Sequence, residues 1–131
     1  MRVNGHNVLA IIVAAALMYG IGALIYGVIF TRQWQEWSGV SMQGAETWRL
    51  ALSPLMPLLQ AIGLSLVLKW RNLPGAGAGI ATGFMMALFF VFASNLYNLA
   101  YYNVHPGVTA IDALHLFAIN MVGGAILGAW R

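Results

Sequence analysis

Asp112 and His115 are the side chains in this sequence whose types and spacing are best suited to chemistry. Both lie in the stretch "IDALHLFAIN", residues 111–120, inside an apolar run that covers residues 108–130. The histidine follows the aspartate by three positions, so on a helix the two side chains share one face. An ionised carboxylate alone in a bilayer core costs roughly 3 kcal/mol on insertion scales. Asp112 therefore needs polar neighbours.

The Asp112–His115 pair has one structural interpretation and several functional ones. "TAID", residues 109–112, fits a capping box, in which the acid satisfies amides of the first helical turn. The functional alternatives are a proton or ion relay and a pocket for a small ligand or a lipid headgroup. A metal site is the weakest alternative, because the chain has three histidines and no cysteine. We expect no metal and no cofactor.

The rest of the chain has the composition of a protein that lies in a bilayer. Of its 131 residues, 61% are hydrophobic and 7% are charged, whereas soluble domains carry roughly 25% charged residues. A bilayer core needs about 20 apolar residues of helix. We expect an all-α integral membrane four-helix bundle, a single transmembrane domain over residues 1–131. Its predicted parts are helices at about 7–30, 43–69, 76–102 and 108–130, with an interfacial segment at 31–42.

The basic residues predict the orientation of these helices. With four spans, one side of the membrane holds Arg2, Lys69, Arg71 and Arg131, and the other holds Arg32 and Arg49, offset by Glu36 and Glu46. An excess of Lys and Arg marks the cytoplasmic side. We therefore expect both termini in the cytoplasm and the protein in the inner (plasma) membrane of a bacterium. No basic patch with interleaved aromatic residues is present, so nucleic acid is not an expected partner.

Small residues at four-residue spacing predict how the helices pack. Close backbone approach drives helix association in lipid, and the helix-packing candidates are Gly79, Gly83, Gly124, Gly128 and Gly20. Such stripes serve either one bundle or a contact between subunits. Because three stripes are more than one thin bundle needs, we expect a homo-oligomer.

Asn120, midway along the last run, is expected to bond another helix.

A depth argument places further polar groups beside the pair. The third and fourth helices form an antiparallel hairpin, so Asn98 matches Asp112 in depth and Asn95 matches His115. Counted back from the end of the first run, Tyr26 reaches the same level. We expect these five side chains to converge in the outer half of the bundle.

Several local motifs together resemble one known family. They are Val3-Asn4, Gly22-Ala23-Leu24 with Tyr26, Ile111-Asp112-Ala113 with His115-Leu116, and the closing run from Gly124 to Trp130. Nearly the whole chain resembles the domain of unknown function 1761 family. The resemblance implies a four-span membrane protein without an assigned activity, and it supplies no catalytic residues.

Three functions follow from these observations. The first is a small polytopic, non-enzymatic membrane protein whose polar cluster stabilises packing or binds a lipid or small ligand. The second is a proton-linked channel or small carrier that uses Asp112 and His115. The third, a membrane-embedded enzyme, is disfavoured because no nucleophile–base pair or phosphate-binding loop is recognisable. The expected partners are the lipid bilayer, other copies of the chain, and a small ligand or lipid headgroup.

Overall fold

The computed structural model describes residues 2–41 and 47–130. A small hairpin at the amino end pairs strand β1 (Arg2–Val3) with strand β2 (His6–Asn7). The elements that follow are helical, and η1 and η2 among them are π-helical. In chain order they are α1 (Val8–Leu24), η1 (Ile25–Ile29), α2 (Thr31–Ser38), α3 (Thr47–Leu52), α4 (Leu55–Arg71), α5 (Ala76–Met86), η2 (Ala87–Phe92), α6 (Ala93–Tyr101) and α7 (Pro106–Ala129).

Four helical stretches are long and apolar enough to cross a membrane. They are Val8–Ile29, Thr47–Arg71, Ala76–Tyr101 and Pro106–Ala129. The prediction of an all-α protein with four long apolar helices is therefore confirmed.

The second of these stretches differs from the single helix expected at 43–69. A turn at Ser53 and Pro54 separates α3 from α4, because a proline lacks the backbone N–H that would continue the helix. Residues 43–46 of the expected helix lie outside the described residues.

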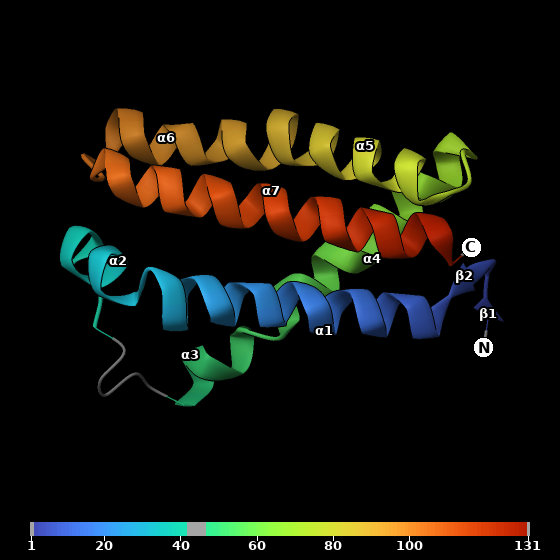
Figure 1. Ribbon diagram of the computed structural model, residues 1–131, viewed down its shortest axis with the longest axis horizontal. Helices are drawn as coiled ribbons and strands as arrows, with labels where there is room; N and C mark the ends of the chain where they lie inside the picture. The colour runs from blue at the N-terminus through green and yellow to red at the C-terminus, as the bar shows by residue number, and fades with distance from the viewer. Residues whose placement is uncertain (1, 42–46, 131) are drawn as a thin grey trace.

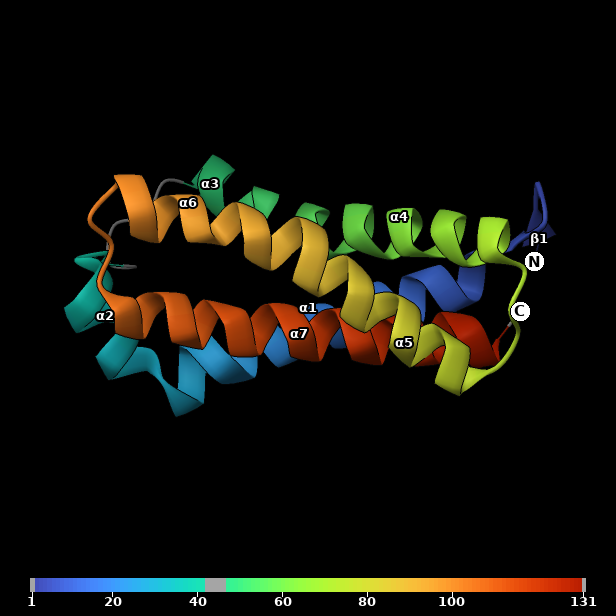
Figure 2. The same cartoon turned by 90° about the horizontal axis from the view of Figure 1, so that it is seen from above.

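The long helices lie side by side along the long axis of the molecule (Figure 1). Both chain termini lie at one end, together with the connection between α4 and α5. The opposite end holds α2 and the connection between α6 and α7 (Figures 1 and 2). We call these the terminal end and the α2 end.

Glycine backbones bring α5 and α7 into direct contact. A Cβ atom on Gly79 would overlap the backbone carbonyl of Gly124, and one on Gly83 would overlap that of Asn120. Near the terminal end, a Cβ on Gly128 would run into the backbone of α5. These glycines therefore pack two helices of one chain. The glycine stripe of α1 differs, because nothing lies within 4 Å of a Cβ built on Gly20.

Asn120 is buried in this contact, but its side chain does not bond another helix. Its Nδ2 donates to the carbonyl of Leu116 in α7 itself, at 2.8 Å. Within the described residues this side-chain bond stays in α7, and the backbone carbonyl of Asn120 is the group that faces Gly83 of α5.

The remaining core lies where α1, α4 and α7 meet. Buried side chains of α1, such as Ala14 and Met18, pack there with Leu64 of α4 and Ile119 of α7. Figure 1 shows α4 running obliquely, from the α5 side of the bundle at the terminal end to the α1 side at the α2 end. This divergence leaves one flank of α6 without a covering helix at the α2 end.

Candidate functional site

Asp112 lies one turn deeper in α7 than a capping residue would. The helix begins at Pro106, and its N-cap is His105, whose Nδ1 accepts the N–H of Gly107 at 3.0 Å. No acidic residue lies in the first turn of α7. The capping-box interpretation of residues 109–112 was therefore wrong. A proline at the first helical position started the helix three residues before Thr109.

Tyr26 is the nearest partner of Asp112. Its hydroxyl donates to Asp112 Oδ1 at 2.7 Å and lies 3.3 Å from His115 Nδ1. The tyrosine ring meets the imidazole edge-on, with ring centroids 4.9 Å apart. Tyr26 belongs to η1, and π-helical turns occur often at functional sites. One phenol thus links the carboxylate and the imidazole that the sequence placed on one helix face.

Trp34 is a partner of Asp112 that the sequence did not indicate. Its indole Nε1 donates to Asp112 Oδ1 at 3.3 Å, and its ring meets Tyr26 edge-on with centroids 5.3 Å apart. Residues 31–42, which contain Trp34, were predicted only to form an interfacial segment. Two features of the sequence could have indicated this contact. The indole of Trp34 can donate a hydrogen bond but cannot accept one, and Trp34 follows closely after the helix that carries Tyr26.

Gly22 makes room for the imidazole. A Cβ atom built on Gly22 would lie 3.0 Å from His115 Nε2. The glycine of α1 therefore lets α7 bring His115 close to the backbone one turn before Tyr26. We call Tyr26, Trp34, Asp112 and His115 the polar cluster.

A groove opens beside the polar cluster along the uncovered flank of α6. Its volume is about 340 Å³, which lies at the lower end of the range for small-molecule sites. The groove runs between η1, η2 with α6, and α7, and is lined by Tyr26, Val91, Ser94, Asn95, Asn98, Asp112 and Leu116. We call it the α6 groove.

Asn95 and Asn98 share the groove with Asp112 but are not hydrogen-bonded to it. Asn98 Nδ2 donates to Asn95 Oδ1 at 3.3 Å, and Asn95 Nδ2 is buried without a hydrogen-bond partner among the described residues. The five side chains expected to converge thus form two sets. Tyr26, Asp112 and His115 make one, and the two asparagines make the other on a different wall of the groove.

The sequence profile of a family described as "Protein of unknown function (DUF1761)" matches residues 9–128. The chain belongs to this family. No functionally curated protein and no solved structure matches it.

The DUF1761 match includes the polar cluster, the α6 groove and most of the α5–α7 contact. Residues 2–7, which form the amino-terminal hairpin, precede it.

The described residues of this DUF1761 protein contain no group of three or more His, Cys, Asp or Glu side chains that could hold a metal ion. The side chains that line the α6 groove offer one carboxylate, one phenol, one hydroxyl and two amides for hydrogen bonding.

Proposed function

We propose that this DUF1761 protein is a non-enzymatic integral membrane protein that binds a small ligand, or the headgroup of a lipid, in the α6 groove. The ligand presents an N–H or O–H donor to Asp112 and an acceptor to Asn95. The amine or hydroxyl of a lipid headgroup has this character, and so does a small free amine or alcohol.

The observation that carries the proposal is a pair of uncommitted polar atoms at one groove. Tyr26 and Trp34 both donate to Oδ1 of Asp112, and no hydrogen bond to its Oδ2 exists within the described part of the chain. Asn95 Nδ2 is a buried donor without a partner. Buried polar atoms in native proteins are almost always satisfied by protein, water or ligand.

The charge of the groove restricts the ligand. No cationic side chain lines it, so an anion would meet Asp112 without compensation in a poorly solvated site. A neutral or cationic donor is favoured instead.

A binding comparison tests this proposal. The purified protein is titrated with short-chain phosphatidylethanolamine, which has N–H donors, and with phosphatidylcholine, which has none, and bound lipid is followed by native mass spectrometry. One hydrogen bond to a charged group predicts about tenfold tighter binding of the ethanolamine lipid. Equal affinity for the two lipids contradicts the proposal.

Two variants assign the preference to the groove. Asp112→Asn keeps an oxygen that accepts from Tyr26 and Trp34 but loses the charge, so the lipid preference should disappear. Glu36→Gln is the matched control, because it removes an exposed carboxylate at the α2 end that pairs with Arg32 instead of lining the groove. Competition by free ethanolamine would identify a small molecule as the ligand. If Asp112→Asn is less stable and the wild type shows no lipid preference, the polar cluster serves helix packing and not ligand binding.

A proton-linked channel or carrier is the second candidate, and one observation favours it. The hydroxyl of Tyr26 lies within hydrogen-bonding distance of both Asp112 and His115, which makes a chain of three titratable groups. The test is proton flux into liposomes that contain the protein and a pH-sensitive dye. Flux that is lost in both Asp112→Asn and His115→Gln supports this candidate. Wild-type flux no greater than that of protein-free liposomes rejects it.

We further propose that the terminal end faces the cytoplasm of a bacterial inner membrane. Arg2, Lys69 and Arg71 lie at this end without a carboxylate partner among the described residues, whereas Arg32 at the α2 end is paired with Glu36 at 2.7 Å. The positive-inside rule then assigns the terminal end to the cytoplasm.

We also propose that the chain assembles with copies of itself. The face of α1 and η1 that carries Gly20 and Gly27 is open, because nothing lies within 4 Å of a Cβ built on either. Small residues on an open face allow close approach of a second helix. Native mass spectrometry of the wild type and of Gly20→Leu tests this, and a wild-type protein that is monomeric at all concentrations contradicts it.

A further inference from the structure

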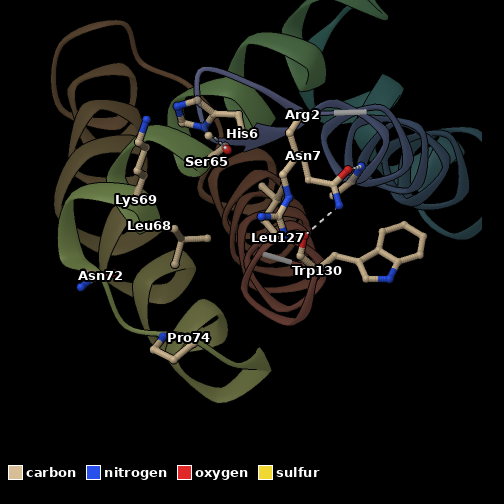
Figure 3. A pocket seen from close by; sticks show the side chains of 12 residues that line it. Arg2, His6, Asn7, Ser65, Leu68, Lys69, Asn72, Pro74, Leu127 and Trp130 are labelled. Carbon is tan, nitrogen blue, oxygen red and sulfur yellow. Dashed lines mark hydrogen bonds between the residues drawn. The ribbon is translucent and has the colours of Figure 1, made fainter.

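A second pocket lies at the terminal end, far from the α6 groove. Its volume is about 540 Å³. The hairpin, the start of α1, the end of α4 and the end of α7 enclose it (Figure 3). Its polar lining includes Arg2, His6, Asn7, Ser65 and Lys69, and Trp130 stands at its side. We call it the terminal pocket.

The amino-terminal hairpin forms one wall of the terminal pocket because of its turn. Asn4 and Gly5 both have positive φ, 50° and 81°, and an Asn-Gly pair with positive φ at both positions favours a two-residue hairpin. Arg2 is thereby paired with Asn7, and Val3 with His6. The turn therefore carries a guanidinium and an imidazole over the end of the helices.

Three contacts fix the hairpin in this position. His6 Nδ1 and Ser65 Oγ are 2.8 Å apart, and Asn7 Nδ2 donates to the carbonyl of Trp130 at 3.0 Å. Lys69 donates from its Nζ to the carbonyl of Asn4. Asn7 is also the N-cap of α1, and its side chain accepts from the N–H of Ala10 at 3.3 Å. A wall held to both α4 and α7 is organised before any ligand arrives, which lowers the cost of binding.

No carboxylate of the described residues lies beside the cations of the terminal pocket. The chain has three acidic residues, Glu36, Glu46 and Asp112. Neither Glu36 nor Asp112 lines the pocket, because they belong to α2 and to the half of α7 at the α2 end, and Glu46 lies outside the described residues. Figure 3 shows the Arg2 side chain directed into the pocket, and no ion pair of Arg2 exists within residues 2–41 and 47–130.

We propose that the terminal pocket binds a phosphate group, with Arg2 and Lys69 as its cationic ligands. A guanidinium presents a planar fork of donors that matches two phosphate oxygens, and a lysine ammonium adds a compact charge. The floor of the pocket is apolar, with Ala10, Leu68 and Leu127. Basic pockets between helices on the cytoplasmic side of a membrane are known to take anionic lipid headgroups. A phosphodiester of an anionic lipid and a soluble phosphate share the chemistry that this pocket recognises.

The experiment has one arm for each source of phosphate. The purified protein is titrated with phosphatidylglycerol, with phosphatidylcholine as the zwitterionic comparison, and bound lipid is counted by native mass spectrometry. In the second arm inorganic phosphate is titrated against the protein by calorimetry, with chloride at matched ionic strength. Selective binding in the first arm identifies a lipid phosphate, and binding in the second identifies a soluble one.

Variants test whether the terminal pocket is the site. Arg2→Gln removes a charge that has no described bond, so the fold should be unaffected, and affinity should fall about tenfold or more for one lost charge-assisted bond. Lys69→Gln is the second variant, with thermal unfolding as a check because Lys69 also holds Asn4. Arg32→Gln is the matched control, because it removes the same charge at the α2 end and should change affinity less than twofold. Absence of binding in both arms, or equal losses in Arg2→Gln and Arg32→Gln, overturns the proposal.

Discussion

Replacement of Gly79 by alanine is the sharpest test of the contact between α5 and α7. The added methyl group would overlap the backbone of Gly124. Backbone atoms cannot rotate away as a side chain would, so the two helices must separate by about 1 Å, a gap that forfeits up to about half of the dispersion attraction of neighbouring atoms. Overpacking of this kind costs typically about 1–3 kcal/mol. We expect the free energy of unfolding to fall by a net 1–2 kcal/mol or so, because alanine regains about 0.5–1 kcal/mol over glycine within a helix.

Gly77 provides the matched control in the same helix. It lies two positions from Gly79 in α5, and nothing lies within 4 Å of a Cβ built there. Gly77→Ala should therefore show only the propensity gain. Unfolding in mixed micelles with increasing dodecyl sulfate, followed by circular dichroism, gives the two free energies. Their difference isolates the steric cost of about 1–3 kcal/mol. Equal stability of the two variants would refute the direct backbone contact.

Three further predictions concern other parts of the chain. Trp34→Phe keeps an aromatic ring beside Tyr26 but removes the indole donor to Asp112, so the free energy of unfolding should fall by about 1 kcal/mol. Trp70→Phe, at a highly exposed position, is its control and should have no effect. Gly107→Ala places a methyl group into the ring of Trp37 and should lower the melting temperature of the purified protein. Reporter proteins fused to the two termini should report the same side of the membrane, because both ends lie together; opposite sides would contradict four spans.

The contacts among Tyr26, Asp112 and His115 show what can be predicted by counting residues to estimate depth in the membrane. Each helix rises by a fixed distance per residue, so groups at equal depth on neighbouring helices are readable from residue numbers. Depth alone does not say which way a side chain faces. The two asparagines accordingly lie at the same groove as Asp112 but bond each other.

The hydrogen bond from Trp34 to Asp112 could not be predicted by counting depth. Its reach to Asp112 depends on α2 turning back against α7 directly after Phe30. A tryptophan near a helix end has the same composition signal whether it anchors at an interface or points into the bundle. The start of α7 was also misjudged, because Pro106 and Thr109 both carry helix-start signals, and the proline prevailed.

The sequence by itself determined that the chain contains four long apolar helices and that Asp112 lies well inside the last of them. This information is local, because the length of an apolar run and its lack of charged residues can be read without knowing which helices pack against it. Only the tertiary structure decided that Gly79 and Gly83 serve contacts within one chain while Gly20 stays open. It alone placed the hairpin of residues 2–7 over a basic pocket. The physical reason is that packing depends on the direction in which each helix presents its face, and that direction is fixed by the other helices rather than by the helix itself.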